Sequence, residues 1–541
     1  MVNKEFRECL VSKLSVCKQI DISGDKQFIE FSKTRNRFQS IHFREKVFLY
    51  SESLENIYDE NYQRFQSIVV CQSHMLPWIY PSLQENIIKE LELNISFGIS
   101  DDDIPQFIEF FESGLLKSIE TFNLVIYFET EEDEDSIQME TPNLSGLVNV
   151  ENLYLEYDNR LSIEDAHYFD DFQSLRDLSI SETQIRLETL VNVIKYSQSI
   201  QTIYFYHLIV GNNIQNESYD QVFNALGQSK TILNCTINGG FGSLVCLIRN
   251  LNLNTHLKVM VVDEFKFSDK NKAVGLCHFP LMIVSNPYLE KLEINNFTKL
   301  YSNWSVVSNL KQISLKPRQE IDPQYLVQIH PHCKTISCQD TSNIAEIIKL
   351  NHSSLESISI NNRCEIVTSD NFPIVSSLQM NWHIRELSIS TFVDISLIVD
   401  LIQLNHKPLV KLSFCDALGW NITSVFSALA ENKHLEYISI INVNTDSELP
   451  ITKCTDKFPR ETISEFLLSL CNLVNRNHQL NYIRIQVPPH TGEIPMSDIE
   501  TFRKTIQNNS QFLNHLHLYS PNKHINEILN RYLIDNTPYY N

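Results

Sequence analysis

The sequence is poor in glycine, with 12 in 541 residues, and its 12 cysteines include no Cys-x-x-Cys pair. So little glycine excludes an organisation built on long flexible linkers. The missing pair removes the usual sign of a metal or redox site, and Cys235 and Cys338 fall within apolar, strand-like runs. Buried, reduced thiols of this kind are typical of cytosolic proteins. We therefore expect a cytoplasmic protein with continuous structure.

The chain also lacks any apolar run near the ~18 residues that a membrane-spanning helix requires. Residues 1–8 contain no core of a signal peptide. Basic residues are outnumbered, because 44 Lys and Arg stand against 66 Asp and Glu, for a net charge of −22. This balance predicts no binding to nucleic acid or to an anionic membrane. A protein partner with a basic face would fit it, although an acidic surface commonly serves solubility alone.

Motifs for catalysis are missing as well, since the chain has neither GxSxG nor HExxH. His330, His332, Cys333 and Cys338 have zinc-type side chains, but both cysteines take apolar strand positions and should point into the core. Gly239–Gly242 precedes a helical segment without the lysine of a phosphate loop, so a tight turn explains it better. The sequence predicts no enzyme, no metal and no cofactor.

What the chain does contain is a hexad, in which an apolar residue is followed by two variable residues, an apolar, a variable and an apolar residue. The second apolar residues of its nineteen copies are Ile20, Ile41, Ile68, Leu91, Phe122, Leu153, Leu178, Ile203, Cys235, Met260, Leu292, Ile313, Ile336, Ile358, Leu387, Leu412, Ile438, Ile483 and Leu516. The mean step is about 28 residues, at the long end of the range for repeats of this type. The alternation that ends each hexad predicts a short strand with one buried face.

Between hexads the apolar spacing becomes helical. Segments beginning at Ile104, Leu187, Ile395 and Ile463 have apolar residues at helical intervals. Pro323 and Pro373 suit helix starts, where a missing N–H group costs nothing.

Asparagine recurs shortly before the next hexad. Asn254, Asn286, Asn432 and Asn477 stand three residues before its first apolar position, and Asn351 and Asn405 stand four before it. Asparagine tolerates the left-handed conformation that closes many helices. We therefore predict a unit of strand, turn, helix and asparagine stop.

This unit resembles the leucine-rich repeat family, and residues 425–440 resemble its ribonuclease-inhibitor-like class. The resemblance implies an α/β solenoid curved like a horseshoe, with parallel strands on the concave face and helices on the convex face. It implies an N-terminal cap at 1–15, a repeat array at 16–520 and a C-terminal cap at 521–541. Steps between hexads vary from 21 to 45 residues, and the Asn or Cys that usually follows the family's strand is mostly missing. We therefore expect irregular repeats.

Two segments interrupt the array. Residues 129–135 are almost entirely acidic, and residues 442–459 lie within the longest step and are rich in Asp, Thr and Pro. The first predicts a solvated loop and the second an inserted loop. Either could reach a partner, and either could be a tolerated insertion.

In each hexad the residue between the last two apolar positions should face the concave side. Six successive repeats place serine there, namely Ser314, Ser337, Ser359, Ser388, Ser413 and Ser439. The row is either a polar floor for a partner or a relief of crowding where strands converge. Both interpretations stay open at this point.

Aromatic residues on the same face are the other binding candidates. Tyr154, Glu156, Tyr204 and Tyr206 form one predicted cluster, with Tyr437 and Tyr482 as a second. Exposed aromatic rings beside carboxylates are typical anchors for proteins. We predict a non-catalytic scaffold that binds a protein partner through its concave face. The alternatives are a regulatory adaptor, such as a ubiquitin-ligase substrate receptor or a small-GTPase regulator, and a structural repeat protein with no fixed partner.

Overall fold

The computed structural model divides the chain into two compact units, Met1–Asn295 (unit 1) and Asn296–Asn541 (unit 2). The residues described are 20–22, 46–49, 67–70, 76–86, 88–97, 104–128, 141–158, 161–210, 218–268, 283–294, 300–301, 303–315, 322–338, 344–361, 366–367, 373–418, 422–441, 463–485, 494–513, 515–518, 525 and 528. Both units consist of parallel strands alternating with helices.

In unit 1 the main strands pair in chain order. They are β1 (Ile20–Ile22), β2 (Lys46–Leu49), β3 (Ser67–Val70), β4 (Glu90–Phe97), β5 (Thr121–Phe128), β6 (Asn152–Tyr157), β8 (Asp177–Ser181), β10 (Thr202–Tyr206), β12 (Asn234–Asn238), β14 (Val259–Asp263) and β16 (Lys291–Ile294). Short strands follow some of them, namely β7 (Ser162–Ile163), β9 (Gln184–Ile185), β11 (Ile209–Val210), β13 (Phe241–Gly242) and β15 (Lys266–Phe267). The helices are α3 (Leu76–Gln84), α4 (Ile104–Glu112), the 3-10 helix η5 (Leu115–Ser118), α5 (Leu187–Tyr196), α6 (Asp220–Gln228) and α7 (Leu244–Leu253).

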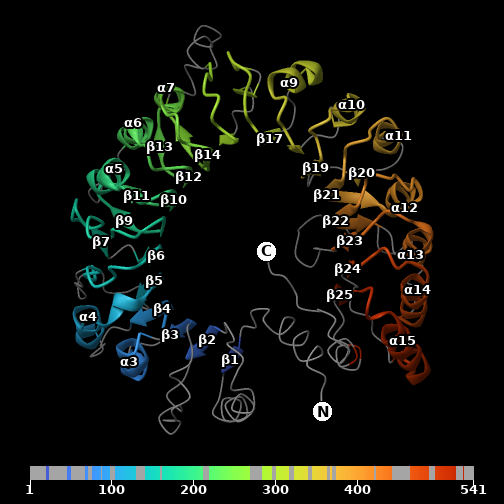
Figure 1. Cartoon of the computed structure of the whole chain (residues 1–541), viewed down its shortest axis with the longest axis horizontal. Helices are drawn as coiled ribbons and strands as arrows, with labels where there is room; N and C mark the ends of the chain where they lie inside the picture. Colours follow the sequence, from blue (N-terminus) through green and yellow to red (C-terminus); the bar gives the residue numbers. More distant parts are fainter. Residues whose placement is uncertain are drawn as a thin grey trace. The chain divides into compact units, whose positions relative to one another are not determined.

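Unit 2 repeats the same arrangement. Its strands are β17 (Gln312–Leu315), β18 (Thr335–Cys338), β19 (Ser357–Ile360), β20 (Ile366–Val367), β21 (Glu386–Asp394), β22 (Lys411–Leu418), β23 (Tyr437–Ile440), β24 (Tyr482–Ile485) and β25 (His515–Leu518). Its helices are α9 (Pro323–Ile329), α10 (Ile344–Lys349), α11 (Ile374–Gln379), α12 (Ile395–Gln403), α13 (Ile422–Glu431), α14 (Ile463–Arg476) and α15 (Met496–Asn509). Within each unit the main strands lie on the concave side and the helices on the convex side, as the repeat predicts (Figure 1).

The strand register confirms the hexads with one correction. In unit 1, Leu153, Leu178 and Ile203 are lateral neighbours, and the other predicted positions align in the same way within their units. The position predicted at Ile41 is wrong, because Val47 pairs with both Ile20 and Ile68. Arg44 stands where the hexad before Val47 would need its first apolar residue, so the pattern pointed to the wrong frame.

Among the residues whose burial is described, each core is built from alternate side chains of the strands and from one face of the helices. The side chains of β6 alternate between half-buried and buried, and Leu153 and Leu155 point inward. The helices predicted to begin at Ile104, Leu187, Ile395 and Ile463 are confirmed as α4, α5, α12 and α14. Burying each large apolar side chain stabilises the fold by roughly 1.5–3 kcal/mol.

The asparagines before the hexads have a different role from the predicted one. Asn254, Asn286, Asn432 and Asn477 are buried and do not have positive φ, so the prediction of a left-handed stop is wrong for them. It is right for Asn351 and Asn405, at φ 49° and 47°. Their side-chain oxygens accept hydrogen bonds from Trp382 and Lys433 backbone N–H groups in the next repeat.

The buried asparagines form lateral ties between repeats. In each, the side-chain NH₂ group donates to a backbone carbonyl of the preceding repeat, and the side-chain oxygen accepts from the backbone N–H groups two and three residues ahead. The residues that do so are Asn254, Asn286, Asn381, Asn432 and Asn477. The amide serves because it carries both donors and an acceptor.

Some predictions fall outside the described residues. These are the cap at 1–15, the acidic segment 129–135 and the insertion 442–459. Within 521–541 only Ile525 and Ile528 are described, and both are buried. No helix in the described part of the chain has the length and apolar character needed to cross a bilayer.

Candidate interaction surface

The strand face of unit 1 brings the first predicted cluster together. Tyr154 and Tyr204 occupy the same register, separated by Ser179 on the intervening strand β8. Glu156 and Tyr206 are separated in the same way by Ser181. Two strand spacings amount to ~10 Å. The side chains of Tyr204 and Tyr206 are each 45% exposed, which is high for aromatic residues on a packed sheet.

A further tyrosine joins this cluster that the hexads did not indicate. The hydroxyl groups of Tyr127 and Tyr154 both donate hydrogen bonds to the Glu156 carboxylate. Tyr127 lies at the end of β5, two residues beyond Val125, which is the register neighbour of Glu156. Residues 124–128 are apolar throughout, so the sequence contains no alternation that would mark Tyr127 as facing outward. We call Tyr127, Tyr154, Glu156, Tyr204 and Tyr206 the tyrosine patch.

The two phenols hold the Glu156 carboxylate in place. Burial and then the hydrogen bond to Glu156 raise the pKa of Tyr154 to about 12. The same two causes raise the pKa of Tyr127. Both hydroxyls therefore keep their protons at neutral pH and donate. The carboxylate is thus oriented before any partner arrives.

The turns that follow the main strands border this patch. Glu182, His207 and Glu264 have φ near 50°, and Gly239 has φ of 81°. His207 stacks edge-on against Tyr206, with ring centroids 4.3 Å apart, and its Nε2 lies 3.3 Å from a Glu264 carboxylate oxygen. A side chain at Gly239 would meet this histidine, because an added Cβ would lie 2.9 Å from His207 Nδ1. Gly239 and Gly240 thus form the tight turn between β12 and β13.

Replacing Gly239 with alanine is expected to lower the free energy of unfolding by about 1–3 kcal/mol, because the left-handed conformation and the contact with His207 both oppose a Cβ. Urea unfolding followed by circular dichroism measures the change. Gly146→Ala is the matched control, since its nearest neighbour would be 3.7 Å away and its φ is not positive. Equal stability of the two variants would contradict the argument.

The predicted serine row exists in unit 2. Ser314, Ser337, Ser359, Ser388, Ser413 and Ser439 are successive lateral neighbours. Ser439 differs from the rest because it is only 3% exposed. Its neighbour on β24 is Arg484, which ends the row of small side chains. The other five serines are half-buried, and both interpretations of the row, a floor for a partner and a relief of crowding, stay predictions.

The second tyrosine cluster is an internal stack. Tyr437 and Tyr482 lie on adjacent strands with ring centroids 4.1 Å apart and planes at 13°. His515 continues the stack at 4.1 Å and 3° from Tyr482, and Lys411 Nζ lies 5.0 Å from the Tyr437 ring. The ring faces are thus engaged with neighbouring strands, where they stabilise the sheet. This leaves less aromatic surface than Tyr204 and Tyr206 offer.

The zinc-type stretch belongs to the core of unit 2. Cys333 and Cys338 are buried, while His332 is exposed. Both nitrogens of His330 are engaged, Nε2 with the Tyr301 carbonyl at 2.8 Å and Nδ1 with the Ser308 hydroxyl. Among the described residues, no group of three or more His, Cys, Asp or Glu side chains could hold a metal ion.

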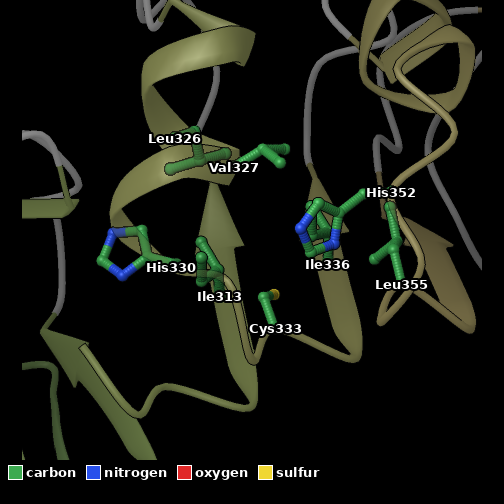
Figure 2. A pocket seen from close by; sticks show the side chains of 8 residues that line it. All are labelled: Ile313, Leu326, Val327, His330, Cys333, Ile336, His352 and Leu355. Atoms are coloured by element: carbon green, nitrogen blue, oxygen red, sulfur yellow. The ribbon is translucent and has the colours of Figure 1, made fainter. Parts of the chain in front are cut away.

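A small cavity adjoins this stretch. Its walls are mostly apolar, and they consist of Ile313, Leu326, Val327, His330, Cys333, Ile336, His352 and Leu355. Figure 2 shows the His330 ring pointing away from Cys333, with His352 on the other side of that cysteine. The two imidazoles therefore do not converge on a common point.

Parallel main strands in register, outer helices and the hexads define an α/β solenoid of leucine-rich-repeat type. No protein-family model matches the sequence, and no curated protein matches it. Among solved structures, a chain of the yeast Rad7–Elc1 complex is 12% identical over 85% of this chain and 94% of that chain, with a TM-score of 0.34.

Two other solved structures show a similar level of likeness. The Arabidopsis receptor kinase HAESA, solved with the peptide hormone IDA and the co-receptor SERK1, is 13% identical over 88% of this chain and 74% of that chain, with a TM-score of 0.28. An internalin of Listeria monocytogenes is 14% identical over 75% and 85%, with a TM-score of 0.24. The fold assignment itself rests on the register and helices of this chain.

Proposed function

We propose that the protein is a non-catalytic scaffold that binds a protein partner through the strand face of unit 1. The observation that carries this proposal is the tyrosine patch. Tyr204 and Tyr206 are 45% exposed on a strand paired on both sides. Large rings held rigidly lose little entropy on binding, and tyrosine is enriched among the residues that dominate interface energies.

The titratable groups fit a binding role better than a catalytic one. Burial raises the pKa of the Cys235 thiol, and it raises the pKa of Cys333 to about 12, so neither thiol is a nucleophile at neutral pH. Both are buried in the cores of their units. The same free, buried cysteines support a cytosolic location.

The finer assignments from the sequence are also proposals. We assign the repeats to the ribonuclease-inhibitor-like class, because residues 425–440 contain the end of α13, the buried Asn432 and the strand β23. We take 16–520 as the repeat array, flanked by caps at 1–15 and 521–541. The regulatory-adaptor alternative would use the same surface and differs only in the partner's identity.

Replacing both Tyr204 and Tyr206 with alanine is expected to weaken partner binding at least about tenfold, since each ring of an interface centre contributes on the order of 1–2 kcal/mol. Partners recovered from native cytosol on the wild-type chain would be identified by mass spectrometry, and the affinity of the purified partner would be measured for both chains.

Tyr196→Ala is the matched control, because Tyr196 ends helix α5 and its side chain is 68% exposed. Circular dichroism verifies that both variants fold. A partner that binds the double variant as tightly as the wild type would refute the role of the patch. A ligase subunit or a small GTPase as the partner would favour the regulatory adaptor.

A further inference from the structure

Negative charge gathers on the strand face that carries the tyrosine patch. From β4 to β16 the main strands present to that face the carboxylates of Glu90, Glu92, Glu156, Asp177, Asp263 and Glu293. Among the described side chains of these strands the one cation is Lys291, whose Nζ lies 3.4 Å from Glu293, and Glu92 has interactions of its own. Within the described part of the chain, no ion pair involves Asp177 or Asp263. The face therefore has a clear excess of negative charge.

At the edge of the sheet where the main strands begin, the charged side chains form ion pairs. There Lys89 pairs with Glu120 at 3.1 Å, Arg176 with Glu151 at 3.7 Å and Lys258 with Glu290 at 3.8 Å. Charge on that edge is thus neutralised across neighbouring repeats. At the opposite edge Glu182 is exposed, and it lies close enough to Tyr127 and Tyr154 to raise the pKa of both. Glu156, Asp177 and Glu182 thus place negative charge directly beside the rings of the patch.

The acidity is not a general property of these repeats. In unit 2 serine is the commonest residue at the corresponding positions, and their charged residues are Glu386, Lys411 and Arg484. Lys411 Nζ lies 3.7 Å from a Glu386 carboxylate oxygen. One repeat architecture thus carries a neutral or basic strand face in unit 2 and an acidic, aromatic one in unit 1. Net charge alone does not account for this difference.

The form of the patch favours one kind of cation. Tyrosines on adjacent strands, Tyr437 and Tyr482, stack directly at 4.1 Å. Tyr154 and Tyr204 lie one strand further apart, with only a serine between them. A flat guanidinium can stack on a tyrosine ring while its N–H groups donate to a carboxylate, and a lysine ammonium cannot do both in one plane.

We propose that the partner presents an arginine-bearing, basic segment to the tyrosine patch, with a guanidinium donating to the Glu156 carboxylate beside the exposed rings of Tyr204 and Tyr206. This inference rests on the proposed scaffold function and specifies the chemistry of its partner. The carboxylate that receives the arginine is already fixed by Tyr127 and Tyr154. Little reorganisation is then needed on binding.

The test uses the full chain and a fluorescein-labelled peptide with three Gly-Arg-Gly-Ser repeats, with binding followed by fluorescence anisotropy. The arginine peptide should bind more tightly than its lysine counterpart. The citrulline peptide, which is flat but uncharged, and the glutamate peptide should not bind measurably. Binding should weaken about tenfold or more between low salt and 0.5 M NaCl. Equal binding of the citrulline peptide would overturn the inference.

Variants distinguish the patch from general acidity. Glu156→Gln should weaken arginine-peptide binding about fivefold or more, because the neutral amide loses the charge-assisted hydrogen bonds. Glu188→Gln removes the same charge from the exposed surface of α5 and should change nothing. If Glu156→Gln does not fold, Glu182→Gln tests the same prediction, because the Glu182 carboxylate lies near Tyr127 and Tyr154 of the patch. Equal weakening by Glu188→Gln would overturn the inference, since it would mean attraction to net charge only.

The outcomes also separate this inference from the scaffold function. A cytosolic partner that is lost on replacing Tyr204 and Tyr206, but is unaffected by Glu156→Gln and by excess arginine peptide, would overturn the arginine inference alone. A partner unaffected by any of these substitutions would overturn both. A partner displaced by the arginine peptide and weakened by Glu156→Gln would support both.

Discussion

Replacing Asn477 with alanine is expected to lower the free energy of unfolding of unit 2 by about 4 kcal/mol. The side-chain NH₂ group donates to the carbonyls of Leu429 and Asn432 at 2.6 and 3.0 Å. The oxygen accepts from the N–H groups of Gln479 and Leu480 at 2.9 and 3.0 Å. Alanine would leave the Asn432 carbonyl and the N–H groups of Gln479 and Leu480 without these partners at a position that is 7% exposed, whereas the Leu429 carbonyl keeps its hydrogen bond from the Asn432 N–H. Each orphaned buried group costs roughly 1–3 kcal/mol.

Urea unfolding of the full chain measures this loss as a shift in the transition that reports on unit 2. Asn472→Ala on the exposed side of α14 is the control, with an expected change within about 0.5 kcal/mol. Asn477→Asp should be no more stable than the alanine variant, because it keeps the acceptor but loses both donors and buries a charge. If Asn477→Ala were as stable as Asn472→Ala, the asparagine ties would not hold the repeats together.

Acidification from pH 6.5 to pH 4 is expected to remove about 3 kcal/mol of stability through His330 alone. Burial lowers the pKa of this histidine to about 4 in the folded protein. Because Nε2 donates to the Tyr301 carbonyl, Nδ1 is the nitrogen that accepts from the Ser308 hydroxyl. A protonated ring would lose that acceptor and place a charge in the core.

The direction follows from the two protonation states. The folded pKa lies below the unfolded value of about 6.5, so the unfolded chain binds the proton first as the pH falls. The stability that neutral His330 gives the folded protein is therefore fully present above pH 6.5, and it is lost as the pH falls toward 4. His330→Gln cannot titrate, and its stability should fall less steeply than that of the wild type over this range.

Urea unfolding at pH 7, 5.5 and 4 compares the slopes. His478→Gln is the matched control for replacing a histidine of unit 2, because His478 is exposed and stacks on Phe512. The prediction concerns the difference in slope, which does not depend on any loss that His330→Gln shows at pH 7. Parallel curves for wild type and His330→Gln would contradict it.

Strand register was predictable from sequence because a packed strand must place apolar residues at alternate positions. Leu178, Ile203 and Cys235 are fixed in this way, since a slip of one residue would expose them. The rule failed at Val47, where a strand lacks the leading apolar residue. The hexad of Val47 has Arg44 at its first apolar position, so it matches the pattern less well than the stretch around Ile41. The strand itself contains only the second and third apolar positions, Val47 and Leu49.

Roles that depend on neighbouring repeats were harder to predict. The sequence showed that asparagine recurs before the hexads. It could not show that the side chains donate hydrogen bonds to the preceding repeat, because a pattern within one repeat does not reveal contacts between repeats. The face of Tyr437 was correct, yet its stacking on Tyr482 depends on the adjacent strand. Tyr127 was missed because it lies beyond the hexad. Only the packed structure shows which side chains occupy neighbouring positions.

The asparagine ties also explain how repeats of unequal length can coexist. The partners of Asn477 are 45 and 48 residues away along the chain, whereas those of Asn254 are 25 and 28 residues away. The local hydrogen bonds are the same in both cases. The segment of a repeat between two successive asparagine ties can therefore be longer or shorter without changing the hydrogen bonds of either tie. Such a chain can acquire new segments during evolution by insertion, while the stacking of its repeats is inherited unchanged.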